Sequence, residues 1–269
     1  MFLENLKKKR ILIFIIFIFF VSSCAIKERL KEKPIVTYIE KPAELLLQDA
    51  NRYLLKKNYT LAAQTFEEID KQHPYSKIAK KSKIMAAYAH YLNKDYKNSI
   101  FAIDRFITLH PADKQLMPYI LYLKGLCYFD RINNVALDQD PSKNTKKVFQ
   151  ELIKKFPNSI YSKDAKKKIL IANDQLAAKE MNVGRYYQQK NRHLAAIERF
   201  KIVINDYNTT AQTPEALYRL TESYLSLGII GEAKKTTAVL GYNFKESNWY
   251  KLSYDLFKKY GYKKNGKQG

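Results

Sequence analysis

The chain contains 269 residues, of which 46% are hydrophobic, with only eight glycines and eight prolines. This composition excludes a disordered protein, and the shortage of turn residues and alternating apolar runs argues against an all-β fold. The formal net charge of +22 is typical of nucleic-acid binding, but the positive charges are mostly lysines scattered along predicted helices. We interpret them as solvated helix faces and expect no nucleic-acid partner.

The amino terminus has the layout of a secretory signal. Basic residues at 7–10 precede an apolar run over 11–21, which is shorter than the roughly 18 residues that a membrane-spanning helix needs. The run ends in VSSC at residues 21–24, which resembles the lipobox of bacterial lipoproteins, in which the cysteine thiol receives a diacylglycerol. We predict a lipoprotein signal peptide over 1–23 and lipidation of Cys24. The alternative is a buried cysteine in an uncleaved anchor.

Residues 24–42 are charged and bracketed by prolines, so we predict a tether rather than a folded element. Ala25, which follows the lipidated position, resembles the pattern of lipoproteins that are released to the outer membrane. We therefore expect a protein that is lipid-anchored on the periplasmic face of the outer membrane.

One spacing of residues recurs beyond the tether. In the stretch from Val183 to Tyr207, Phe200 follows Ala196 by four residues, Tyr187 by thirteen and Gly184 by sixteen. A small residue lets two helices approach, an aromatic ring fills the space beside it, and residues four apart share a helix face. The spacing recurs before four other residues, in weaker form before the last two, and a proline that can end the helix follows three of them after eight residues. These four residues are Phe66, Ile103, Phe149 and Thr237, and the prolines are Pro74, Pro111 and Pro157.

These copies resemble the tetratricopeptide repeat, nominally about 34 residues long. They predict an all-α fold, a right-handed superhelix of five tetratricopeptide-like helix hairpins. The step from Phe149 to Gly184 is about fourteen residues longer than the other steps, close to four helical turns, so we expect one long helix from Lys163 to Gln189. An insertion is expected around residues 135–142. The predicted parts are repeats 1–3 over 43–157, repeats 4–5 with a capping helix at 249–260 over 158–260, and a flexible tail over 261–269.

Several short runs within the repeats stand out. They are AIDRFI at 102–107 before His110-Pro111, YILYLKGL at 119–126, DQDP at 138–141, FPNS at 156–159, Asp164-Ala165, and the 183–207 hairpin. In this order behind a lipobox they resemble the BamD family, the lipoproteins of the β-barrel assembly machinery, over nearly all of the mature chain. The loop between Asp130 and Pro141 is shorter than in familiar members, which puts partner contacts there in question.

The resemblance implies a periplasmic scaffold without enzymatic activity. Its expected partners are a BamA-type outer-membrane barrel subunit, accessory assembly lipoproteins, unfolded outer-membrane proteins, and the membrane through the lipid anchor. It implies that repeats 1–3 bind substrate and repeats 4–5 dock the barrel subunit. Arg199 falls on the docking arginine of the family; the alternative is an exposed arginine that pairs with Glu198 or Asp206.

Helix geometry predicts a groove on repeats 2 and 3. Residues just after and four after the small packing residues turn toward the concave side. Aromatic side chains with a polar tip suit an extended, aromatic-ended peptide, although ordinary packing between repeats is an equal alternative. The predicted groove residues are Tyr88, Tyr91, Leu126 and Phe129, together with Tyr119 and Tyr122, which lie a turn or two earlier.

The sequence shows no catalytic or metal-binding pattern. None of the four histidines has a second ligand at metal spacing, and no Walker loop or nucleophile motif is present. Cys127 lies in an apolar run and is expected to be an inert packed thiol. We expect no metal, no cofactor and no enzyme. The remaining alternatives are another envelope repeat adaptor, for a peptidoglycan or protease system, and a periplasmic hydrolase.

Overall fold

The computed structural model describes residues 40–265, with side chains up to residue 260. The predicted signal peptide, Cys24 and Ala25 lie outside the described residues, as does nearly all of the predicted tether. The described residues from Pro42 onward belong to one compact unit. None of the helices within 40–265 combines the length and the apolar character needed to cross a bilayer.

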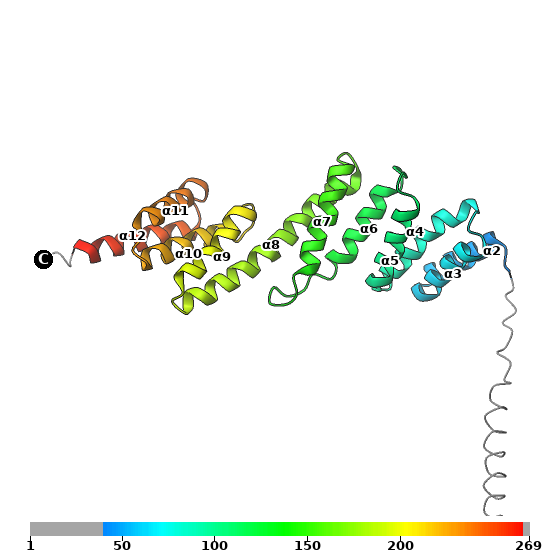
Figure 1. Cartoon of the computed structure of the whole chain (residues 1–269), viewed down its shortest axis with the longest axis horizontal. Helices are drawn as coiled ribbons and strands as arrows, with labels where there is room; N and C mark the ends of the chain where they lie inside the picture. Colours follow the sequence, from blue (N-terminus) through cyan, green and yellow to red (C-terminus); the bar gives the residue numbers. More distant parts are fainter. Residues whose placement is uncertain (1–39, 266–269) are drawn as a thin grey trace, which may run out of the picture. The chain divides into compact units, whose positions relative to one another are not determined.

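Residues 40–265 contain eleven helices and no strand, which confirms the all-α prediction. Successive helices pack in pairs as five helix hairpins: α2 with α3, α4 with α5, α6 with α7, α8 with α9, and α10 with α11 (Figure 1). The last helix, α12, packs on α10 and α11. The helices are α2 Ala43–Leu55, α3 Tyr59–Gln72, α4 Lys77–Leu92, α5 Tyr96–Leu109, α6 Met117–Phe129, α7 Asp140–Lys155, α8 Ile160–Gln189, α9 His193–Asp206, α10 Thr213–Ser226, α11 Ile230–Asn243 and α12 Asn248–Asn265.

In the third hairpin and again in the fourth, a glycine of the first helix packs closely against a phenylalanine of the second helix. A Cβ placed on Gly125 would lie 2.1 Å from Cε1 of Phe149, and one placed on Gly184 would lie 2.5 Å from Cε1 of Phe200. Both rings are fully buried. The small-plus-aromatic spacing therefore marks the points where the two helices of a hairpin touch, as the sequence predicts.

The fifth hairpin replaces this apolar contact with hydroxyl groups. Thr221 Oγ1 lies 2.7 Å from Thr236 Oγ1, and Thr237 Oγ1 lies 2.9 Å from Ser253 Oγ of α12. A buried hydroxyl needs a partner, and each of these has one. The weak fifth copy of the spacing is thus a hairpin with a polar contact.

Four of the five hairpins share one turn. Three residues join the two helices of each hairpin. The hydrogen bonds at the end of the first helix form a Schellman motif, for example from Asn58 N to Tyr53 O at 2.9 Å. The motif needs one residue with positive φ. That residue is Lys57, Lys94, Asn191 or Gly228, with φ of 58°, 59°, 56° and 73°.

The third hairpin differs, because residues 130–139 form its connection. The insertion was expected around 135–142, but residues 140–142 are the first turn of α7 and not part of the loop. Pro141 suits this position, since the first turn of a helix needs no amide donor from it. The extra length therefore lies earlier in the chain than predicted.

The predicted long helix is confirmed. α8 has 30 residues and begins at Ile160, three residues before the expected start, because the hydroxyl of Ser159 accepts a hydrogen bond from the amide of Tyr161. α8 packs against α6 and α7 and also against α9 and α10. It therefore connects the first three hairpins to the last two. The capping helix α12 also extends further than expected, so residues 261–265 are helical rather than part of a tail.

Candidate binding surfaces

The six predicted groove residues lie on α4 and α6, the first helices of the second and third hairpins. All six are half-buried, and they pack on two neighbouring hydrophobic clusters. Ring pairs connect them: Tyr88 and Tyr91 have centroids 6.4 Å apart. The structure therefore brings the predicted residues together on one side of the first helices.

Tyr161 of α8 completes this surface. Its ring centroid lies 5.6 Å from that of Tyr119 and 5.2 Å from that of Tyr122. Tyr161 was missed because the repeat spacing is counted from Gly184, at the far end of the long helix. We name the surface the aromatic band: Tyr88, Tyr91, Tyr119, Tyr122, Leu126, Phe129 and Tyr161.

Carboxylates hold two of the tyrosine hydroxyls. Tyr91 donates to Asp130 Oδ2 at 2.7 Å, and Tyr122 donates to Asp164 Oδ2 at 2.5 Å. Burial and these acceptors raise the pKa of both hydroxyls. Burial also raises the pKa of Tyr119 to about 12. The rings are thus fixed by hydrogen bonds between hairpins, and what they offer to a ligand is their partly exposed faces.

A cation lies at the α8 side of the band. Lys168 Nζ is 4.4 Å from the centroid of the Phe129 ring and 3.5 Å from Asp164 Oδ2. The ammonium group of this lysine therefore lies over the ring and beside the carboxylate, and its side chain is mostly buried. The band therefore joins apolar ring faces to charged groups of both signs.

Arg199 lies on α9 and pairs with Glu180 of α8. Its Nη1 is 3.0 Å from Glu180 Oε2, and its side chain is 40% exposed. The two carboxylates expected as alternatives are not its partners: Glu198 pairs with Lys201 at 3.2 Å, and no ion pair of Asp206 is seen within residues 40–265. Sequence reasoning missed Glu180 because it belongs to the other helix of the hairpin.

The described residues contain no cluster of three or more histidines, cysteines or carboxylates that would hold a metal. His90 Nε2 lies 2.9 Å from Glu67 Oε1, and His110 caps the end of α5. Cys127 is fully buried, its thiol donates to Ser99 Oγ at 3.2 Å, and burial raises its pKa to about 11. A thiol in this environment is poorly reactive, which agrees with a packing role.

Comparison with known proteins shows which family this chain belongs to. Residues 39–240 match the family model YfiO, described as "Outer membrane lipoprotein". A relative from Caulobacter vibrioides is 43% identical over 236 residues, which covers 88% of this chain and 76% of the relative. The chain belongs to the BamD (YfiO) family.

Other BamD proteins agree with this assignment. A relative from Rickettsia prowazekii is 43% identical over 219 residues, covering 81% of this chain and 87% of its own. One from Neisseria meningitidis serogroup A is 33% identical over 237 residues, covering 84% and 88%. All three carry the name "Outer membrane protein assembly factor BamD". The part that matches the BamD family model includes the whole aromatic band and Arg199, while α12 lies beyond it.

Proposed function

We propose that this chain is a scaffold lipoprotein of outer-membrane protein assembly. It binds segments of unfolded outer-membrane proteins on the aromatic band and docks a BamA-type barrel subunit on the surface of α9 around Arg199. The observation that carries the proposal is 43% identity to a BamD assembly factor over 88% of the chain. Accessory assembly lipoproteins are its further partners, and its role is to hold proteins together rather than to catalyse a reaction.

The chain is anchored on the periplasmic face of the outer membrane through acylated Cys24. The lipobox-like residues 21–24 and the match to a family described as outer membrane lipoproteins support this. Metabolic labelling with an alkyne fatty acid tests it. Wild-type protein should carry the label and fractionate with the outer membrane, and Cys24→Ser should do neither. A Cys24→Ser variant that keeps the label would contradict the anchor.

The substrate site is tested by removing two rings from the aromatic band. Tyr88→Ala combined with Tyr122→Ala should weaken binding of labelled outer-membrane-protein peptides, measured by fluorescence anisotropy, and should leave helicity unchanged. The matched control is Tyr75→Ala combined with Tyr242→Ala, because these tyrosines are 100% and 89% exposed and lie outside the band. Unchanged affinity together with a lower melting temperature would show that the band only packs the repeats together.

The docking role of Arg199 is separated from its pairing with Glu180 by a charge swap. Arg199→Glu should abolish co-purification with the barrel subunit from detergent-solubilised outer membranes. Arg199→Glu with Glu180→Arg restores the ion pair inside the protein but still reverses the charge at position 199. If the double variant regains the barrel subunit, Arg199 acts through its local pair. If co-purification stays lost, Arg199 contacts the partner.

A further inference from the structure

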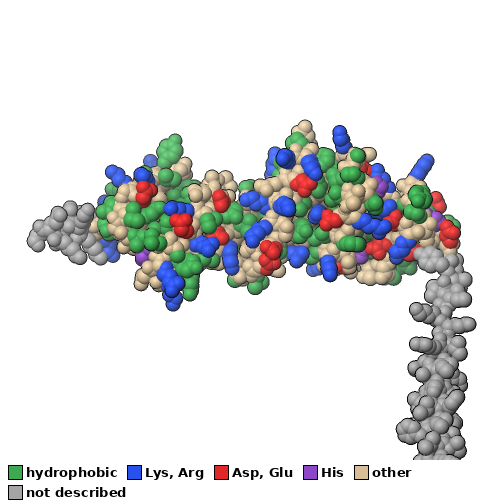
Figure 2. All heavy atoms as spheres, viewed as in Figure 1, with side chains coloured by type: hydrophobic (Ala, Val, Ile, Leu, Met, Phe, Trp, Pro, Cys, Tyr) green, Lys and Arg blue, Asp and Glu red, His purple; other side chains and the backbone are tan. Residues whose placement is uncertain are grey.

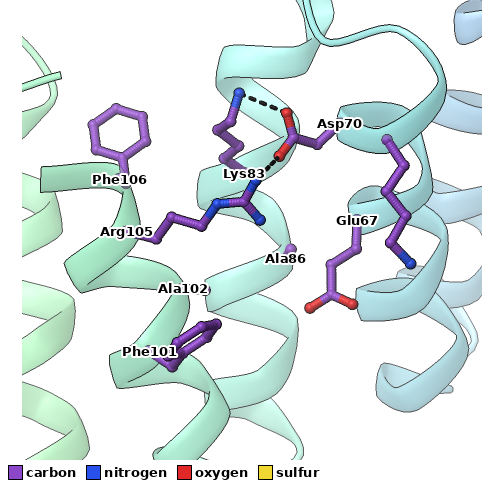
Figure 3. A pocket seen from close by; sticks show the side chains of 9 residues that line it. Glu67, Asp70, Lys83, Ala86, Phe101, Ala102, Arg105 and Phe106 are labelled. Atoms are coloured by element: carbon purple, nitrogen blue, oxygen red, sulfur yellow. Dashed lines mark ion pairs between the residues drawn. The ribbon is translucent and has the colours of Figure 1, made fainter. Parts of the chain in front are cut away.

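A cleft opens between α3 and α5, the second helices of the first two hairpins, above α4 (Figure 3). Its volume is about 200 Å³, which is room for one large side chain rather than for a folded element. Small residues, Ala86 of α4 and Ala102 of α5, and the buried ring of Phe106 line its apolar part. Phe101, whose ring is 69% exposed, stands at its edge.

The carboxylates of the cleft already have hydrogen-bond or ion-pair partners within the protein. Asp70 is 90% buried and lies 2.7 Å from Lys83 Nζ and 3.4 Å from Arg105 Nη2, the two ion pairs drawn in Figure 3. Glu67 is bonded to His90, which lowers the pKa of Glu67 and keeps it ionised. Neither carboxylate therefore needs a further donor from a ligand.

The cations at the mouth retain free donors. Arg105 is 61% exposed, and within residues 40–265 its one ion pair is the 3.4 Å contact with Asp70, which leaves most of its five N–H groups for a ligand. Lys71 is 66% exposed, and its ion pair with Glu68 of the same helix is long, at 3.7 Å. Phe101 and Arg105 are four residues apart and share one face of α5. The mouth thus places an apolar ring beside two exposed cations whose ion pairs within the protein are long.

We propose that this cleft docks an extended acidic segment of a partner protein. One carboxylate of the segment binds Arg105, with Lys71 nearby, and an adjacent apolar side chain enters the cleft against Phe101, Ala86 and Ala102. Charge-assisted bonds of arginine to a carboxylate supply the orientation, and the small floor residues supply the space.

Charge favours this occupant over two others. A second copy of this chain is disfavoured, because a formal net charge of +22 opposes self-association. An anionic membrane surface is flat and does not fill a cleft, whereas a protruding side chain does. A single acidic side chain beside an apolar one fits both the charge and the volume.

The cleft is separate from the aromatic band. Ala86 precedes Tyr88 by two residues and Tyr91 by five, so roughly 200° and 140° of rotation around α4 separate the cleft floor from the band. An acidic segment and a substrate peptide therefore bind opposite sides of the same helix. The inference does not depend on the proposed substrate site.

A selection experiment on the full chain tests the proposal. A random dodecapeptide display library is panned on the purified protein, and the most enriched peptides are synthesised and measured by fluorescence anisotropy. Arg105→Ala and Phe101→Ser are the test variants. Arg52→Ala and Tyr75→Ser are matched controls, because Arg52 is 58% exposed and also pairs with an aspartate, and Tyr75 is fully exposed.

We expect enriched peptides that place Asp or Glu next to a large apolar residue. Their affinity should fall about tenfold or more in Arg105→Ala and in Phe101→Ser, and should not change in the controls or in Tyr88→Ala with Tyr122→Ala. Two results would overturn the proposal: enriched peptides that lack acidic residues, or a peptide affinity in both test variants that equals that of the wild-type protein. So would binding to phosphatidylglycerol vesicles, or self-association in sedimentation, that is lost in Phe101→Ser. Because Phe101 is exposed, Phe101→Ser should keep its fold, so a loss of binding in this variant reports on the cleft.

Discussion

The first helices of neighbouring hairpins contact each other in two chemically different ways. Between α4, α6 and the start of α8, the contact is the aromatic band, with tyrosine hydroxyls bonded to Asp130 and Asp164. Between the end of α8 and α10, ion pairs and hydrogen bonds lie beside a shared apolar cluster that contains Met181 and Leu220. Arg185 Nη1 lies 3.0 and 3.1 Å from the two oxygens of Glu215, and Gln188 Nε2 donates to Arg219 O at 3.1 Å.

The same repeat therefore presents contacts of two chemical kinds, and we propose that they serve different ligands. Half-exposed rings suit apolar peptide side chains, whereas a set of fixed charges suits a folded, polar partner surface. We name the second set, Arg185, Gln188, Glu215, Arg219 and Ser223, the polar network. Figure 2 shows Lys and Arg side chains spread along the visible face of the described residues rather than gathered in one place.

The largest loss of unfolding free energy is expected from changes in the glycine–phenylalanine contacts inside the third and fourth hairpins. Gly125→Ala should cost about 3 kcal/mol of unfolding free energy, because the new methyl overlaps the buried ring of Phe149. Gly184→Ala should cost somewhat less, since its Cβ would lie 2.5 Å rather than 2.1 Å from the ring. Urea unfolding measures both.

Gly231→Ala is the matched control for these two glycines. It is helical, and nothing lies within 4 Å of its added Cβ, so it should gain about 0.5–1 kcal/mol. Equal losses at all three positions would contradict the role of the glycine–phenylalanine contact.

A change in the polar network should come next. Glu215→Gln keeps the shape but removes the charge that faces Arg185 and Arg219, and should cost about 1–2 kcal/mol. The loss should shrink when unfolding is measured at high salt, because salt already weakens the wild-type pairs. Glu232→Gln, which breaks an exposed pair with Lys235, is the control and should have almost no effect.

The aromatic band should respond differently to the same measurement. Tyr122→Phe removes the hydroxyl bonded to Asp164 and should cost about 1 kcal/mol, with little dependence on salt. Tyr242→Phe, at an exposed ring, should be neutral. A strong salt dependence of the Tyr122→Phe effect would remove the distinction between the two regions.

Alkaline pH should weaken the band through Tyr119. Its pKa is raised to about 12 in the folded state from 10 in the unfolded chain. The folded state therefore holds the Tyr119 proton more tightly than the unfolded chain does. The resulting contribution to the free energy of unfolding is complete below pH 10 and is lost as the pH rises toward 12. Tyr119→Phe should remove about 1 kcal/mol of this pH dependence at pH 11, measured by urea unfolding from pH 8 to 11. An unchanged slope would show that Tyr119 ionises freely.

The sequence alone predicts the hairpins well, because their contacts are local. The offset of sixteen residues places Gly184 opposite Phe200, and an extension close to four turns keeps the apolar stripe of α8 in phase. Both follow from helical periodicity, without knowledge of the tertiary structure. The same periodicity brings four of the groove residues to equivalent positions on neighbouring first helices, Tyr88 and Tyr91 on α4 and Leu126 and Phe129 on α6.

Side-chain contacts between hairpins, and ion pairs between the two helices of one hairpin, escape this reasoning. Tyr161 reaches Tyr119 only because the start of α8 lies beside α6, and Glu180 reaches Arg199 across the fourth hairpin. The cleft between α3 and α5 needs two alanines on different helices to face the same space. The boundary of the insertion was also wrong, because a proline in the first turn of α7 gives the same sequence signal as a proline in a loop.

The most direct test of the proposed division between the aromatic band and the docking surface around Arg199 is site-specific photo-crosslinking in intact cells. A benzoylphenylalanine replaces Tyr88 of the aromatic band or Leu194, which is 68% exposed on the same helix as Arg199. We predict that position 88 crosslinks to unfolded outer-membrane proteins and position 194 to the barrel subunit. Crosslinking of unfolded outer-membrane proteins from position 194 but not from position 88 would contradict the account.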